Sequence, residues 1–192
     1  MSLPRPVQTL PEDAAPPRGP GLALVRGIGR VFGALPRPLA IAAAGGWMFL
    51  IWWLSSGPIE VKPRIPAPSF FWNLAHAPVF GVLAVLLATA AAPRPLPRSW
   101  PDPGWPARLV ALGGVALWAA LDEWRQGRVP ARHGSAFDFA TDLTGALCVL
   151  WIAAYAGRAS ADEIGMRRRL LAGVALCAAA ALATTLFDRR GG

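Results

Sequence analysis

The chain has 192 residues, of which 54% are hydrophobic, and its formal net charge is +8 at pH 7. The arginines are scattered over every predicted loop and form no basic stripe or aromatic-interleaved motif, which argues against a nucleic-acid-binding protein. Because the apolar residues are clustered in long runs, the pattern is typical of a membrane protein rather than of a soluble core. A protein that faces anionic lipid would account for the excess of positive charge.

The N-terminal region is predicted to stay on the cytoplasmic side of the membrane. Residues 1–20 are rich in proline and lack an apolar h-region, so we expect a disordered cytoplasmic tail rather than a signal peptide. In the segment 21–37, Leu22 and Phe32 mark one helix face and Arg26 another. This pattern predicts an amphipathic helix that lies in the membrane interface.

Five later segments are long and apolar enough to be predicted as transmembrane helices. A helix rises 1.5 Å per residue, so a segment of about 20 residues crosses a hydrocarbon layer of roughly 30 Å. The five segments are 38–56, 70–92, 107–126, 136–157 and 169–187. We therefore predict an all-α fold, a polytopic membrane helix bundle. Residues 38–157 are expected to form its four-helix core, and residues 158–192 to add a cytoplasmic loop and a fifth helix.

The distribution of Lys and Arg predicts the orientation of the bundle. Twelve of them fall in the N-terminal region and in the second and fourth loops, whereas seven fall in the first and third loops and at the C-terminus. The positive-inside rule places the side with twelve in the cytoplasm. We therefore expect a multi-pass protein of the cytoplasmic membrane with a cytoplasmic N-terminus, whose loop between the third and fourth spans faces outward.

The stretch 121–146 carries most of the candidate functional residues. Asp122, Glu123 and Gln126 share the last turn of one predicted span, because they are three or four residues apart. Asp138 and Asp142 are four residues apart and share a stripe of the next span. Ionisable groups at the margins of membrane spans are costly unless they are paired or hydrated, so they indicate a site.

The order of residues in this stretch is Asp-Glu-x-x-Gln, Val-Pro-x-Arg, Gly-Ser-x-x-Asp, then a polar residue and a Gly. These positions are Asp122, Glu123, Gln126, Val129, Pro130, Arg132, Gly134, Ser135, Asp138, Asp142 and Gly145. With the sequence WWLSSGP at 52–58 and with His76, this order resembles the VanZ-like membrane protein family over about residues 40–157. The family usually carries Asn where this chain has Asp142. The resemblance implies a cell-envelope protein associated with low-level teicoplanin resistance.

With this topology, several polar groups are expected to converge at the outer side of the membrane. We predict a polar, ligand-binding cavity there. Its lining would be His76, Asp122, Glu123, Gln126, Arg132, Asp138 and Asp142. Asn73 shares a helix face with His76 and is expected at the same cavity.

Several of these residues also have structural interpretations. Ser135 and Asp138 fit a capping box at the start of the fourth span. Arg132 could pair with Asp122 or Glu123 and hold the loop on the bundle. His76 could be a core histidine bonded to a carbonyl. Arg125 and Arg128 are expected to be solvated or to face lipid.

Three classes of function follow from these residues. The first is a protein that binds a membrane lipid or a lipid-linked cell-wall precursor, with Arg132 contacting a phosphate or carboxylate. The second is an intramembrane enzyme that uses Glu123 or Asp122 with His76 as general acid or base. The third is a structural subunit, because the abundant Ala and Gly in the spans suit close helix packing. We expect the first class, with no cofactor and no metal site; the sequence leaves the oligomeric state open.

Overall fold

The computed structural model describes residues 19–56, 66–129 and 134–187, and in these ranges it contains six α-helices and no strand. The helices are α1 (Pro20–Gly33), α2 (Arg37–Leu54), α3 (Pro66–Ala91), α4 (Trp105–Gln126), α5 (Ala136–Ala156) and α6 (Glu163–Phe187). The all-α prediction is therefore confirmed. The predicted tail, apart from its last two residues, lies outside the described part of the chain.

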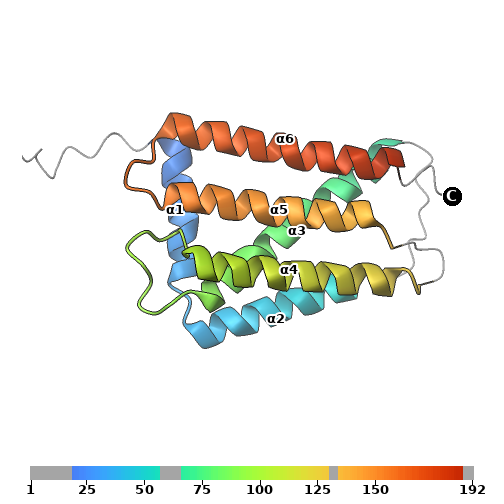
Figure 1. The fold of residues 1–192 in the computed structure, drawn as a ribbon, viewed down its shortest axis with the longest axis horizontal. Coiled ribbons are helices and arrows are strands. Elements are labelled where there is room, and N and C mark those ends of the chain that lie inside the picture. The colour runs from blue at the N-terminus through green and yellow to red at the C-terminus, as the bar shows by residue number, and fades with distance from the viewer. Residues whose placement is uncertain (1–18, 57–65, 130–133, 188–192) are drawn as a thin grey trace, which may run out of the picture.

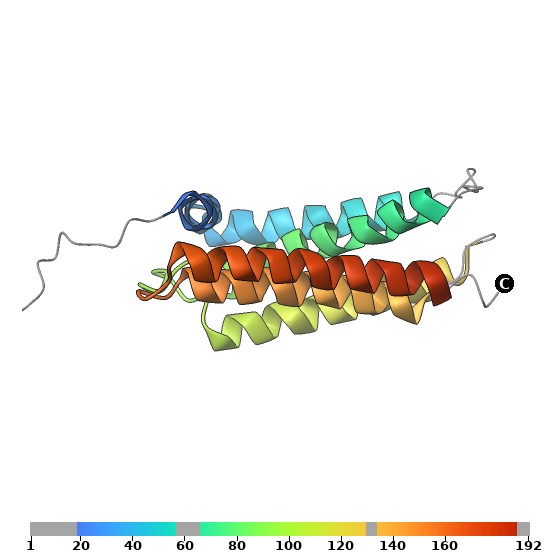
Figure 2. The same cartoon turned by 90° about the horizontal axis from the view of Figure 1, so that it is seen from above.

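The long helices form one elongated bundle. Helices α2, α4, α5 and α6 run along its length, α3 crosses them obliquely, and α1 lies across one end (Figure 1). Figure 2, seen from above, looks along the axis of α1 at that end of the bundle. The C-terminal end of α4 and the start of α5 lie at the opposite end.

Four helices are long and apolar enough to cross a membrane: α2, residues 70–91 of α3, α5 and α6. Their outer faces carry large apolar side chains such as Leu171 and Val174 of α6, which are 71% and 69% exposed. An apolar exterior of this kind requires an apolar solvent, so the chain is a membrane helix bundle. Helix α4, the remaining predicted span, is not among the four. Both of its ends carry charged residues, Arg108 at one and Asp122, Glu123 and Arg125 at the other.

Helices α3 and α5 approach each other closely at Gly145. A Cβ atom added there would lie 2.1 Å from the carbonyl oxygen of Ala77, so only glycine permits this contact. Leu83 and Phe80 of α3 and Ala146 of α5 are buried next to this crossing. Gly145 therefore has a packing role, because it allows two backbones to meet.

Charged side chains join helix α1 to the bundle at its N-terminus and near its middle. The carboxylate of Glu163 accepts hydrogen bonds from the backbone N–H groups of Gly21 (3.1 Å) and Leu22 (2.9 Å). Arg26 donates to the carbonyl oxygens of Ala156 (2.9 Å) and Arg158 (2.9 Å), near the end of α5. The acidic group thus satisfies a helix N-terminus and the basic group a helix C-terminus, as their dipoles favour.

The start of α6 differs from the predicted span. The helix begins at Glu163 rather than at residue 169. The prediction started later because it followed hydropathy, and the first turns of the helix are charged.

Asp162, just before α6, accepts hydrogen bonds from the backbone N–H of Gly165 (2.6 Å) and from the Tyr155 hydroxyl (2.9 Å). These two donors hold the pKa of the Asp162 carboxyl below its ordinary value.

Candidate functional site

A group of buried and partly buried polar side chains lies at the end of the bundle opposite α1. We call it the polar cluster. It consists of Ser55 at the end of α2, His76 on α3, Asp122, Glu123, Arg125 and Gln126 on α4, and Ser135, Asp138 and Asp142 at the start of α5. Six of these residues are less than 10% exposed: Ser55, Asp122, Glu123, Gln126, Ser135 and Asp142. Four helices therefore deliver polar groups to one place inside an otherwise apolar bundle.

Asp122 is held by three donors. Ser55 donates its hydroxyl to Oδ1 at 2.5 Å, and Gln126 donates from Nε2 to Oδ2 at 2.7 Å. Arg125 pairs with Oδ1 at 3.0 Å and also bonds the hydroxyls of Ser55 and Ser56. This carboxylate is satisfied at both oxygens, so its contacts fasten the end of α2 to α4.

Glu123 connects α4 to the start of α5. Its Oε2 accepts the backbone N–H of Ser135 at 2.6 Å, whereas its Oε1 is buried and lacks a hydrogen-bond partner among the described residues. Ser135 caps α5 as predicted, accepting from the N–H groups of Phe137 (3.2 Å) and Asp138 (3.3 Å). In a complete capping box the backbone N–H of Ser135 would donate to the side chain of Asp138. Here that N–H donates to Glu123 instead.

His76 and Asp142 form a pair inside the bundle. The Nδ1 atom of His76 lies 3.0 Å from Oδ1 of Asp142, and the His76 ring stacks on Phe80 with the ring centroids 6.4 Å apart. Asp142 is only 1% exposed, and its Oδ2 is buried with no hydrogen-bond partner in the described part of the chain. The contact with a carboxylate replaces the expected bond from His76 to a backbone carbonyl.

The polar cluster contains more acidic than basic groups. The carboxylates of Glu123, Asp138 and Asp142 all interact electrostatically with the His76 ring. One buried carboxylate oxygen of Glu123 and one of Asp142 have no hydrogen-bond partner among the residues that the structure describes. A buried acceptor without a donor costs free energy, about 1–3 kcal/mol. The arrangement therefore favours a ligand, or ordered water, that donates hydrogen bonds.

The structure separates some residues that the sequence analysis grouped. Asn73 donates to the hydroxyl of Thr185 at 3.0 Å and so joins α3 to α6 instead of the polar cluster. Arg132 and its predicted pairing lie outside the described residues. The expectation for Arg125 was wrong, because its guanidinium binds Asp122 at 3.0 Å. Arg128 is exposed as expected, and its guanidinium lies 3.4 Å from the ring centroid of Trp124, which is also exposed.

Two serines were expected at the outer end of the first span but were not included in the predicted cavity lining. Ser55 and Ser56 both bond side chains of α4. Their position in the WWLSSGP segment was the available signal. In the described ranges, no three His, Cys, Asp or Glu side chains are arranged to hold a metal ion.

No family model, curated protein or solved structure matches this chain. The functional interpretation therefore depends on the geometry of the polar cluster and on the sequence pattern that supplies its residues.

Proposed function

We propose that this chain is a VanZ-like protein of the cytoplasmic membrane that binds the polar part of a lipid or of a lipid-linked cell-wall precursor at the polar cluster. One observation carries the proposal. Asp142 is 1% exposed on a helix apolar enough to span a membrane, and one of its oxygens lacks a hydrogen-bond partner among the described residues. Such a group is costly to retain without a function, so it marks a binding site by default.

The chemistry of the ligand follows from the acceptors that lack a partner among the described residues. Oxygens of Glu123 and Asp142 accept hydrogen bonds, so the ligand presents hydroxyl, amine or amide N–H groups, as sugar and peptide headgroups do. Arg125 uses its two terminal guanidinium nitrogens on Asp122 and on the hydroxyls of Ser55 and Ser56, and its buried Nε has no hydrogen-bond partner in the described part of the chain. A contact between Arg132 and a phosphate or carboxylate of the same ligand remains part of the proposal.

Native mass spectrometry of the protein in a mild detergent tests this function. Wild type is expected to retain a lipid or a cell-wall precursor. Asp142→Asn and Glu123→Gln each replace an acceptor oxygen by an NH₂ donor, and both should lose the ligand while remaining folded. Thr144→Val is the matched control, since the Thr144 hydroxyl donates only to Ala140 of its own helix, at 2.7 Å. Full retention by both acidic-site variants would contradict the proposal.

The same site supplies a readout in cells. Expression of wild type should lower teicoplanin sensitivity, and the Glu123→Gln variant should not. The Thr144→Val control should behave as wild type. Equal resistance in all three strains would show that the resistance phenotype does not depend on the polar cluster.

A second candidate, an intramembrane enzyme, is favoured by the pair of His76 and Asp142. A carboxylate at 3.0 Å from Nδ1 orients the imidazole and leaves Nε2 for proton transfer, an arrangement suited to a general base. Incubation of the purified protein with lipid-linked precursor would distinguish the two functions. Product formation that His76→Ala abolishes supports the enzyme, and unchanged precursor supports binding alone.

The proposed orientation has its own test. The loop at 157–162 lies at the α1 end of the bundle, together with the N-terminal ends of α2 and α4, and the polar cluster lies at the opposite end. A periplasmic reporter such as alkaline phosphatase should be inactive when fused at Ala161 and active when fused after Arg190. The reverse result would place the polar cluster on the cytoplasmic side.

A further inference from the structure

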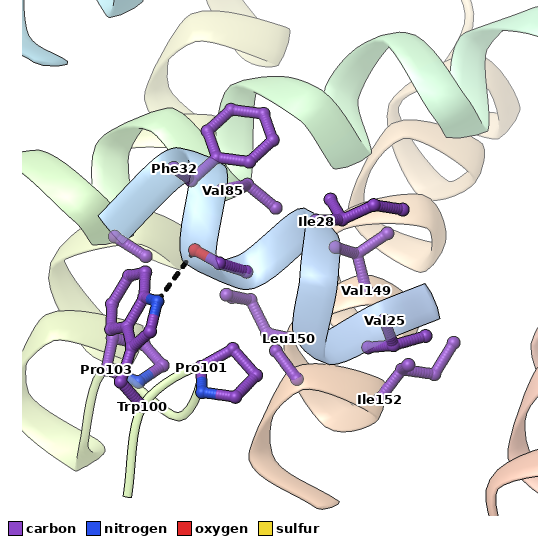
Figure 3. A pocket seen from close by; sticks show the side chains of 13 residues that line it. Val25, Ile28, Phe32, Val85, Trp100, Pro101, Pro103, Val149, Leu150 and Ile152 are labelled. Atoms are coloured by element: carbon purple, nitrogen blue, oxygen red, sulfur yellow. Dashed lines mark hydrogen bonds between the residues drawn. The ribbon is translucent and has the colours of Figure 1, made fainter. Parts of the chain in front are cut away.

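An apolar cavity of about 180 Å³ lies under α1, at the end of the bundle away from the polar cluster. Figure 3 shows its walls: α1 contributes Val25 and Phe32, α3 contributes Val85, and α5 contributes Ile152. The loop between α3 and α4 closes one side with Trp100, Pro101 and Pro103. All thirteen lining residues are apolar side chains or glycine.

The side chains that line the cavity have no unengaged hydrogen-bonding group that could hold a water molecule. The one side-chain donor of the lining, the indole N–H of Trp100, is already bonded to the carbonyl oxygen of Gly29 at 2.7 Å (Figure 3). A buried water needs two to four polar partners, and apolar cavities without them stay dry and take up hydrocarbon. An apolar cavity of about 150 Å³ admits benzene, so this one can hold a hydrocarbon segment of similar size.

The position of the cavity indicates which hydrocarbon reaches it. Helix α1 is amphipathic and exposes Leu24, Ile28 and Val31, which are 63%, 49% and 69% exposed, on its outer side. An amphipathic helix of this kind lies in the boundary between headgroups and acyl chains. Ile28 belongs both to this exposed face and to the lining, so the cavity adjoins the surface that the acyl chains cover.

Helix α1, which forms one wall of the cavity, also carries an exposed basic side chain. Arg30 is exposed and directly follows Gly29, a lining residue. Among the residues that the structure describes, Arg30 has no acidic partner. Guanidinium groups bind phosphate through paired hydrogen bonds, so Arg30 is suited to the headgroup of a lipid whose chain enters the cavity.

We propose that the cavity under α1 binds one acyl chain of an anionic phospholipid, with Arg30 contacting its phosphate. The lipid would wedge between α1, α3 and α5 and fix α1 on the bundle. This site is separate from the polar cluster, and its existence does not depend on the proposed function there.

Titration with phosphatidylglycerol, followed by native mass spectrometry, tests the proposal. Ala153 lines the cavity on α5, and Ala153→Leu fills part of it. The expected result is at least a tenfold loss of affinity for the first phosphatidylglycerol. Ala175→Leu is the matched control, because Ala175 is exposed on α6 and is not part of the lining, and it should bind as wild type does. Equal affinity in wild type and Ala153→Leu would overturn the proposal.

Two further measurements keep the test decisive if Ala153→Leu does not fold. Phosphatidylglycerol with brominated acyl chains should quench part of the tryptophan fluorescence of the wild-type protein. This part should come from Trp100 and should therefore be missing in Trp100→Phe. The absence of such a quenched part would refute occupancy of the cavity by the chain. Arg30→Gln should lower affinity for phosphatidylglycerol about fivefold but leave that for phosphatidylcholine unchanged, and equal affinity of wild type for both lipids would refute the role of Arg30.

Discussion

The pair formed by His76 and Asp142 makes a prediction about stability that can be worked out from the structure. Asp142 is 1% exposed, and its one hydrogen bond in the described part of the chain is to His76 at 3.0 Å. In His76→Ala the carboxylate stays buried but loses that partner. Removing one member of a buried pair costs about 3–5 kcal/mol of unfolding free energy.

Asp142→Asn is expected to have a much smaller effect. The Asn side chain still provides an acceptor for the His76 N–H, and the substitution removes a charge that is expensive to bury. We expect a change of about 1 kcal/mol or less, in either direction. The double variant His76→Ala/Asp142→Asn should then be more stable than His76→Ala alone by roughly 2–3 kcal/mol, because the charge left unpaired by the first change is gone.

The assay is reversible unfolding in mixed detergent micelles with increasing denaturing detergent, supported by thermal melting of the four proteins. Loss of the packing between the imidazole and Phe80 is common to His76→Ala and to the double variant, so their difference isolates the buried charge. If the double variant is no more stable than His76→Ala, Asp142 is not an uncompensated charge, and the reasoning about the polar cluster is wrong.

Two predictions concern other parts of the fold. Gly145→Ala should destabilise the protein by about 1–3 kcal/mol, because its Cβ would press on the α3 backbone, whereas Gly113→Ala, whose Cβ meets no atom within 4 Å, should be neutral or slightly stabilising in the same melting assay. Asp162 has a pKa below its ordinary value because Gly165 and Tyr155 donate to its carboxylate, so its stabilising contribution is present above the unfolded-state pKa of about 4 and is lost as the pH falls through the folded-state pKa. The melting-temperature deficit of Asp162→Asn relative to wild type should therefore shrink on acidification, and a deficit that is independent of pH would contradict this.

Local periodicity was sufficient to predict contacts within one helix. Asp122 and Gln126 are four residues apart on α4, and their side chains bond at 2.7 Å. Ser135 precedes an apolar run and caps α5 through its hydroxyl. Both contacts follow from helical geometry and residue type alone, without any information about neighbouring helices.

Contacts between helices were not predictable in the same way. Glu123 accepts from the Ser135 amide and not from a side chain of its own helix, and Asn73 bonds Thr185 on α6 although it shares a face with His76. The choice among such partners depends on helix rotation and crossing, which are set by close packing at points such as Gly145. Hydropathy places residues in a helix but does not fix its rotation about the axis.

The sequence by itself therefore determined the class of the protein and the membership of most of its polar cluster. Long apolar runs can only be stable as helices in lipid, because every backbone polar group must be paired inside its own segment. The tertiary structure alone decided that Asp142 pairs with His76 and that α1 covers an apolar cavity. It also decided that both oxygens of Asp122 are bonded, whereas one oxygen of Glu123 has no partner among the described residues. These features arise from contacts between residues far apart in the chain, whose distances depend on how the helices pack.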